Sequence, residues 1–252
     1  MEIVFLGTGG GRINLIKQVR ATGGFRINST SANIHVDPGP GALVHSLENR
    51  QNPLALDAIV VTHAHIDHIS DAMVLIEGMT NYSLKKRGTV IASRKAIEEK
   101  GISEYHQNLV ETLYAAEYGE TKKFATEKGS FEMLVLAMRH EEPTTFGFKL
   151  WLDGKVLGYI SDTEYMESLG KDFAGCDCLI VNCMKPESDS YAGHLRISEL
   201  IEVAKQAKPK LCVMTHMGLK MLRAGPVKEA EKVEKESGVK TVAARDGMKL
   251  TV

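Results

Sequence analysis

The feature that most constrains this chain is a cluster of histidine and aspartate side chains directly after an apolar run. Residues 62–68 are Thr-His-Ala-His-Ile-Asp-His, which places four metal-ligating side chains within six positions. The preceding run, Leu56 to Val61, is rich in β-branched residues and predicts a short buried strand. The cluster is therefore expected on the loop that leaves the carboxyl end of a strand, where open α/β sheets place their chemistry. The alternative is a polar helix start with fortuitous histidines.

The spacing within this cluster suits two neighbouring metal ions. Side chains two residues apart in an extended backbone point the same way, so His63 and His65 can hold one ion together. A turn at Ile66 would direct Asp67 and His68 toward a second ion. Imidazole and carboxylate ligands together favour zinc, iron or manganese over calcium or magnesium. We therefore expect two divalent cations, with Zn2+ as the first choice and Mn2+ or Fe2+ as alternatives.

Three later apolar runs predict strands, and each ends shortly before a further candidate ligand. These ligands are His140, Asp162 and His216, which follow the runs 131–138, 155–160 and 211–214. Taken singly, they are equally compatible with a solvated loop histidine, a helix cap and a buried histidine. Taken as an ordered set after the first cluster, they predict one site built at the ends of several strands.

The spacing His63-x-His65-x-Asp67-His68, followed in order by His140, Asp162 and His216, resembles the metallo-β-lactamase superfamily. The resemblance implies an α/β (α+β) fold in which residues 1–252 form a single domain, a four-layer αββα sandwich of two mixed β-sheets with helices outside. It also implies the ligand sets, which are His63, His65 and His140 for the first metal, Asp67, His68 and His216 for the second, and Asp162 as the bridge. Flavin-linked diiron relatives usually have Glu in place of the second His of the motif. The presence of His65 at that position therefore favours hydrolysis over electron transfer.

Turn and helix patterns predict several further elements. These are a β-hairpin at Asp153-Gly154, an amphipathic helix over 197–207, a helix between Pro226 and Gly238, and a helix from about residue 70 to about residue 84. The glycine-rich stretch 7–11 lacks the Gly-Lys-Ser/Thr of a P-loop, so it is expected to be a tight turn that needs positive φ or close backbone approach. In the resembled family a similar turn lies near the metal site, which implies that this turn shapes the pocket.

Four residues outside the ligand set are candidates for support or substrate contact. Asp37 follows a predicted strand and is expected to support the metal-bearing loop. His194 precedes the predicted amphipathic helix, in a region where ribonuclease Z and the cyclic phosphodiesterases of phosphonate breakdown have a similar His that acts as a general acid or binds phosphate. Arg196 and Lys185 could add positive charge to the same rim. The candidate catalytic residues are His194 and the metal ligand Asp67.

Composition limits the partners and the compartment. The formal net charge of −1 indicates no broad basic surface for nucleic acid. No apolar run approaches the length of a membrane span, and the first residues do not resemble a signal peptide. The four cysteines lack zinc-ribbon spacing and are expected to be reduced, buried apolar side chains of a cytoplasmic protein. The resembled enzymes often dimerise, which leaves a homodimer as an alternative to a monomer.

The expected activity is hydrolysis by a metal-activated hydroxide, because two cations that share a water lower its pKa from about 15.7 toward about 7. The glycine-rich turn, His194 and the short chain after His216 resemble the ribonuclease Z-like and cyclic-phosphodiesterase branch, which implies a small or cyclic phosphodiester as the substrate. Ribonuclease Z itself normally has a glycine-rich basic arm, which we do not identify in this sequence. That family also has a Glu near its catalytic His, whereas the matching stretch 179–184 has no acid and the next one is Glu187.

Three other functions remain as alternatives. They are a ribonuclease Z-like endonuclease that processes tRNA 3′ ends, a thioester or lactone hydrolase, and a metal-bound RNA-binding module without turnover. RNA is less favoured than a small phosphodiester as a partner, because the nearly neutral chain has little general attraction for a polyanion.

Overall fold

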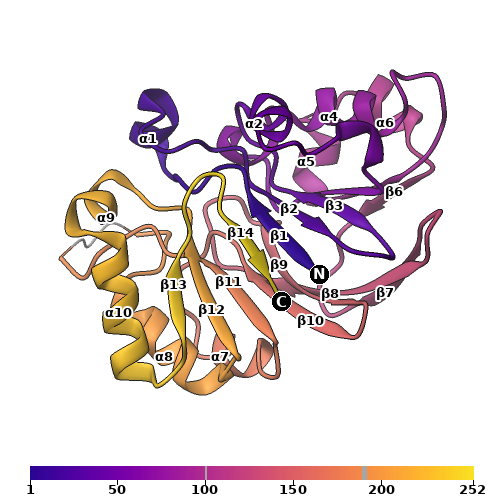
Figure 1. The fold of residues 1–252 in the computed structure, drawn as a ribbon. Helices are drawn as coiled ribbons and strands as arrows, with labels where there is room; N and C mark the ends of the chain where they lie inside the picture. The colour runs from indigo at the N-terminus through magenta and orange to yellow at the C-terminus, as the bar shows by residue number, and fades with distance from the viewer. Residues whose placement is uncertain (100, 189–191) are drawn as a thin grey trace.

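The computed structural model describes residues 1–99, 101–188 and 192–252, and it folds the chain into two facing β-sheets (Figure 1). The strands of the N-terminal sheet, in sheet order, are β14 (Lys249–Thr251), β1 (Glu2–Phe5), β2 (Phe25–Asn28), β3 (Asn33–Val36), β4 (Ala58–Val61), β5 (Thr89–Ala92) and β6 (Thr112–Ala115). Those of the C-terminal sheet are β13 (Thr241–Ala243), β12 (Leu211–Thr215), β11 (Cys178–Asn182), β10 (Lys155–Ile160), β9 (Phe146–Leu152), β8 (Ser130–Ala137) and β7 (Thr121–Ala125). Both sheets contain parallel and antiparallel neighbours, so both are mixed.

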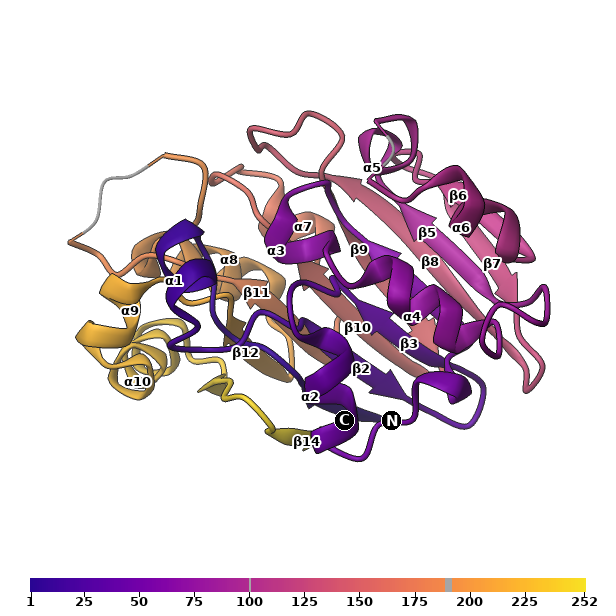
Figure 2. The ribbon, with the colours of Figure 1, turned by 90° about the horizontal axis from the view of Figure 1, so that it is seen from above.

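Helices cover the outer faces of the two sheets (Figures 1 and 2). Those that precede β7 in the chain are α1 (Arg12–Lys17), α2 (Ala42–Glu48), the 3-10 helix η1 (Pro53–Ala55), α3 (Ile66–Ile69), α4 (Ala72–Met79), α5 (Arg94–Glu98) and α6 (Glu104–Leu109). Those that follow β10 are α7 (Leu169–Asp172), α8 (Ile197–Ala207), α9 (Leu219–Ala224) and α10 (Pro226–Ser237). No helix in the described ranges has the length and apolar character to cross a membrane.

The apolar core is divided into three clusters, one for each boundary between layers. The central cluster lies between the sheets, where alternate residues of β9, from Phe146 and Phe148 to Leu150 and Leu152, point inward. A second cluster lies under α8 and α10, and a third lies under α4. This division confirms the expected four-layer αββα sandwich of two mixed sheets. The expectation that residues 1–252 form one domain stays a prediction.

Local sequence patterns account for several element boundaries. Asp153 and Gly154 take φ values of 51° and 73°, the left-handed conformations that a two-residue hairpin turn requires, and they join β9 to β10 as predicted. Helix α8 covers 197–207 as predicted. Helix α10 starts at Pro226 and ends before Gly238, whose φ of 75° stops the helix.

The helix expected to continue to about residue 84 ends earlier than predicted. Helix α4 stops at Met79, and Asn81, Tyr82 and Ser83 have φ values of 54°, 60° and 61°. Three successive left-handed residues cannot continue a right-handed helix. The prediction of its C-terminal end was therefore wrong.

The topology brings the ends of several strands to one edge of the sandwich. Strands β3 and β4 are parallel in the N-terminal sheet, and β10, β11 and β12 are parallel in the C-terminal sheet. Parallel neighbours present their carboxyl ends at the same edge. The residues that follow these strands therefore meet across the two sheets, and they include Asp37, His63, Asp162 and His216.

We predict that the central cluster dominates the stability of the sandwich. Leu150 is fully buried between the sheets, so Leu150→Ala should lower the free energy of unfolding by about 2–5 kcal/mol. The matched control is Leu84→Ala, because Leu84 is 81% exposed and the same substitution there should change stability by less than about 0.5 kcal/mol. Urea denaturation followed by circular dichroism measures both. Equal effects of the two substitutions would contradict the assignment of the core.

Candidate metal centre

All seven expected ligands lie in one cluster, in which four imidazoles surround one oxygen of Asp162, while His65 contacts His140 and Asp67 contacts His216. Oδ2 of Asp162 lies 3.8 Å from Nε2 of His63, 3.5 Å from Nε2 of His68, 3.9 Å from Nε2 of His140 and 3.3 Å from Nε2 of His216. Across the described ranges, four overlapping groups of side chains are close enough to hold a metal ion, and the first two of them are His63 with His65 and His140, and Asp67 with His68 and His216. The other two contain Asp162, once with His63 and His68 and once with His140 and His194. The first two groups are those that the family resemblance implies for two metal ions.

Hydrogen bonds determine which nitrogen of three imidazoles faces the cluster. Nδ1 of His68 donates to Asp37 Oδ2 at 2.9 Å, and Nδ1 of His140 donates to the carbonyl of Gly193 at 3.0 Å. The hydroxyl of Thr62 donates to Asp37 at 2.8 Å and therefore accepts from Nδ1 of His63 at 3.1 Å. Because an imidazole with its proton on Nδ1 has a lone pair on Nε2, all three rings present a lone pair to the cluster. Metal-binding histidines have this arrangement.

The unsatisfied atoms of the cluster match the requirements of a cation. Within the described part of the chain, the buried Nε2 atoms of His63, His68 and His216 have no hydrogen-bond partner. Buried polar atoms nearly always have a partner, so three such atoms around one carboxylate require an explanation. Divalent metal ions that accept these lone pairs, and that carboxylates neutralise, would satisfy all of them. The residues present therefore fit the metal ions that the fold implies.

The electrostatic field of the cluster also favours positive charge. Burial opposes the charged form of His68, but Asp162, Asp37 and Asp67 together raise its pKa well above its usual value, so without a cation Nε2 binds a proton in place of a metal ion. Burial would likewise raise the pKa of Asp162, yet the neighbouring His216 and other histidines hold it well below the ordinary range, so Asp162 is ionised. The site thus holds a buried negative charge that a proton or a metal ion can balance.

Asp37 accepts hydrogen bonds from several residues around the cluster, and its role in supporting bound metal ions stays a prediction. Besides His68 and the hydroxyl of Thr62, its carboxylate accepts the backbone N–H of Thr62 at 2.8 Å and the hydroxyl of Tyr159 at 2.8 Å. The four bonds come from the first metal-binding loop and from β10 of the other sheet. Asp37 therefore orients His68 directly and His63 through Thr62.

Two tight backbone features position His216. Its φ of 56° is unusual for a residue other than glycine and indicates local strain, which folded proteins retain mainly at functional sites. A Cβ at Gly10 would lie 2.2 Å from Cδ2 of the His216 ring, so only glycine fits there. The glycine-rich turn after β1 therefore packs against the candidate centre, as predicted, through close approach as well as the positive φ of 80° at Gly11.

Sequence reasoning missed a buried acid on the loop of His140. Glu142 accepts hydrogen bonds from the hydroxyl of Ser93 at 3.0 Å and from the backbone N–H of Ala64 at 3.4 Å. It joins the His140 loop to the loop that carries His63 and His65. The charged sequence 139–142 indicated a solvated loop, and its pattern contained nothing that would single out Glu142 as buried.

The remaining candidates lie at the rim of the cluster in different roles. Nδ1 of His194 lies 3.6 Å from Oδ2 of Asp162. Burial lowers the pKa of His194 to about 4, although Asp162 opposes this, and the charge of the buried Lys185 contributes to the lowering. The backbone of Lys185 bridges that of Arg196, and the rim role of Lys185 stays a prediction. The guanidinium of Arg196 instead pairs with Glu199 at 3.1 Å, and the Glu199 carboxylate also accepts the backbone N–H of Arg196 at 3.0 Å at the start of helix α8. A substrate contact by Arg196 therefore stays a prediction.

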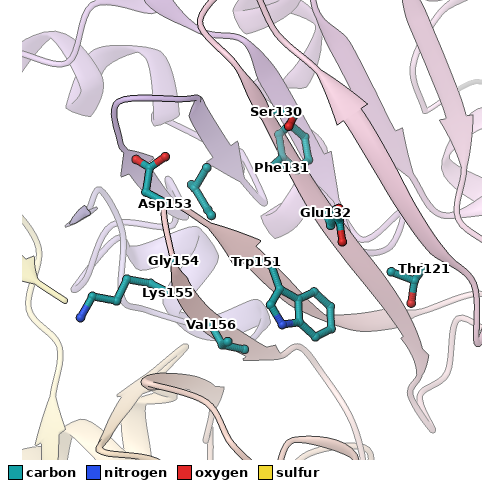
Figure 3. A pocket seen from close by; sticks show the side chains of 10 residues that line it. Thr121, Ser130, Phe131, Glu132, Trp151, Asp153, Gly154, Lys155 and Val156 are labelled. Atoms are coloured by element: carbon teal, nitrogen blue, oxygen red, sulfur yellow. The ribbon is translucent and has the colours of Figure 1, made fainter.

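A hollow of about 490 Å3 lies at the end of the C-terminal sheet that is farther from the metal cluster, and Figure 3 shows its lining residues. It is lined by β7, by β8 and by the β9–β10 hairpin, with Trp151, Glu132 and Lys155 among the side chains shown. Because Asp162 follows the other end of β10, the length of that strand separates the hollow from the metal cluster. Among the described residues, none of the possible metal-holding groups includes a residue of this hollow. The hollow is therefore not a candidate for the chemistry.

Two comparisons with known proteins place this chain in a family. The model of the beta-lactamase superfamily domain matches residues 32–217, which is more than half of the chain and contains all seven clustered ligands. The chain therefore belongs to the metallo-β-lactamase superfamily. A protein of Methanocaldococcus jannaschii that is described as uncharacterised is 35% identical over 259 residues, covering 99% of this chain and 94% of that protein. Ribonuclease Z of Methanopyrus kandleri is 23% identical over 281 residues, covering 98% of this chain and 96% of the enzyme.

Solved structures show the same fold. The metallo-beta-lactamase fold protein YhfI of Bacillus subtilis superposes with a TM-score of 0.81 at 20% identity, covering 99% of this chain and 98% of that one. A diphosphatase from the PhnP family superposes with a TM-score of 0.71 at 16% identity, covering 100% of this chain and 98% of that one. At these identities the likeness establishes the architecture of the chain and leaves its substrate open.

We predict that Glu142 positions His140 for metal binding. Glu142→Ala removes the acceptor for Ser93 and Ala64, so it should raise the dissociation constant for Zn2+ about tenfold to 100-fold. The matched control is Glu141→Ala, because the neighbouring Glu141 is exposed. Calorimetric titration of metal-stripped protein measures the affinity. Unchanged affinity in the Glu142 variant would show that the loop keeps its place without this carboxylate.

Proposed function

We propose that this protein is a metal-dependent hydrolase that uses two divalent metal ions to cleave a small or cyclic phosphodiester. Zinc is the first choice for these ions. The observation that carries the proposal is the ring of imidazole Nε2 atoms around Oδ2 of Asp162, at distances of 3.3–3.9 Å. Zinc suits a site of imidazole and carboxylate ligands, and manganese or iron could replace it.

Each side chain of the cluster has a role in this proposal. His63, His65 and His140 would hold one ion, Asp67, His68 and His216 would hold the other, and Asp162 would lie between them. When bound, the ions supply hydroxide near neutral pH and offset the charge of the phosphate oxygens. His194 would contact the substrate beside Asp162 and donate a proton or hydrogen bond to the departing oxygen.

Two observations support a small substrate over tRNA. The alignment with ribonuclease Z extends over 281 residues, more than the 252 of this chain, so the enzyme has segments that this chain lacks. The formal net charge of −1 provides little general attraction for RNA.

The second candidate is a ribonuclease Z-like endonuclease that processes tRNA 3′ ends. It is favoured by the alignment with ribonuclease Z, which covers nearly the whole of both chains. A thioester or lactone hydrolase and an RNA-binding module without turnover lack a comparable observation in their favour. We further propose a cytoplasmic location, because the four cysteines are buried and free, as in proteins of reducing compartments.

We predict that protein loaded with zinc or manganese hydrolyses bis-p-nitrophenyl phosphate and a cyclic nucleotide. It should act slowly or not at all on a thioester and on precursor tRNA. Asp162→Asn removes the buried negative charge at the centre of the cluster, so it should reduce activity to the level of the metal-free protein. Product release is measured by absorbance and, for tRNA, by gel electrophoresis. Specific cleavage of precursor tRNA at its 3′ side would reverse our ranking of the two candidates.

We also predict that His194 acts on the substrate and leaves the metal ions in place. His194→Ala should lower kcat about 10²-fold to 10⁴-fold, the usual contribution of a positioned acid or base. Metal content, measured by elemental analysis, should stay at the wild-type value. The control is His45→Ala, because His45 pairs with Glu48 on the surface of helix α2. Loss of metal from the His194 variant would instead make His194 a ligand.

A further inference from the structure

A buried chain of hydrogen bonds connects Asp162 to His68 behind the candidate metal centre. Nδ2 of Asn182 donates to Oδ1 of Asp162 at 2.8 Å. The hydroxyl of Tyr159 lies 3.2 Å from Oδ1 of Asn182 and 2.8 Å from Oδ2 of Asp37, which accepts from His68. Tyr159 has one proton to share, and the bond to Asp37 is the shorter of the two. The chain thus runs from the central carboxylate, through both sheets, to a histidine of the second group.

The bond from Asn182 determines which oxygen of Asp162 is available to a cation. Oδ1 is occupied by the amide, whereas Oδ2 faces the imidazole nitrogens at 3.3–3.9 Å. Turning the amide over would place its oxygen against Oδ1, and two acceptors would then face each other, so the orientation is defined. The amide therefore presents Asp162 to the cluster through one oxygen.

The sheet holds Asn182 at the position that this role requires. Strand β11 lies between β10, which ends before Asp162, and β12, which ends before His216. Asn182 is the last residue of β11 and pairs in register with Thr215. A polar side chain at the end of the buried run Cys178–Val181 is costly to desolvate unless it is fully bonded, and a leucine would pack there without that cost.

Asn182 and Tyr159 also line the inner wall of the second group of ligands. A cavity of about 20 Å3 is bounded by both residues together with Asp67, His68 and His216. This is about the space that one water molecule needs. The pair thus lines a small cavity next to the second group of ligands, and Asn182 in addition contacts Asp162.

From these contacts we infer that Asn182 and Tyr159 are positioning residues that hold Asp162 so that its oxygen Oδ2 would be the one available to the metal ions. The inference rests on the proposed dinuclear centre. Asn182 holds Oδ1 away from the imidazole nitrogens, and Tyr159 holds Asp37 in place, with a weaker share of its hydrogen bond reaching Asn182. Loss of a hydrogen bond that orients a metal-binding side chain typically lowers metal affinity about tenfold to 100-fold.

The test compares Asn182→Leu with Tyr159→Phe in metal-stripped full-length protein titrated with Zn2+. Asn182→Leu should raise the dissociation constant of at least one of two sites by about tenfold or more, because Asp162 loses its orientation. Tyr159→Phe keeps the ring in the core and should produce a smaller change in the same direction. The matched control is Asn33→Leu, which removes the amide bond to the carbonyl of Ala55 at the distant start of β3 and should leave the affinity unchanged.

A spectroscopic measurement separates positioning from a purely structural role. In Mn2+-loaded protein, the exchange coupling between the two ions reports on a shared oxygen, so electron paramagnetic resonance should show weaker coupling in Asn182→Leu than in the wild type. Unchanged zinc affinity and coupling in both Asn182→Leu and Tyr159→Phe would overturn the inference while leaving the dinuclear centre intact. Wild-type protein that takes up no metal would overturn the proposed function and the inference together.

Discussion

The buried negative charge of Asp162 is the constraint on which the rest of this site depends. Burying an ionised carboxylate costs on the order of several kcal/mol in desolvation free energy unless its partners compensate for it. Here the amide of Asn182 satisfies one oxygen, and the imidazoles that surround the other leave their Nε2 lone pairs directed toward it. Lone pairs and a carboxylate do not stabilise each other. The arrangement becomes favourable when cations lie between them, which is why the geometry and the family point to the same class of protein.

The two-sheet architecture supplies this site with residues that are distant in the sequence. The first cluster follows β4 of the N-terminal sheet, whereas Asp162 and His216 follow β10 and β12 of the C-terminal sheet. The large apolar cluster between the sheets therefore has a functional consequence, because it sets the distance between the two halves of the site. The backbone also accepts strain at this edge, with φ values of 51° at Asp37 and 56° at His216.

Local patterns predicted those parts of the fold that neighbouring residues control. The Asp153-Gly154 turn and the start of α10 at Pro226 agree with the structure because turn and cap geometry depend on a few adjacent residues. The predicted end of α4 was wrong because three residues in the left-handed conformation follow the helix, and nothing in their side chains required that conformation. Glu142 and Asn182 were missed for a related reason: each is an ordinary polar residue whose partners lie in other segments of the chain.

The sequence by itself determined the chemistry of the site: which side chains can bind a metal, their order, and their placement directly after predicted strands. Ligand type and spacing are properties of the chain that need no long-range contact. Only the tertiary structure decided which nitrogen of each imidazole and which oxygen of Asp162 face the centre. That choice depends on hydrogen-bond partners such as Asp37 for His68, Gly193 for His140 and Asn182 for Asp162, which come within reach only after the two sheets have packed together.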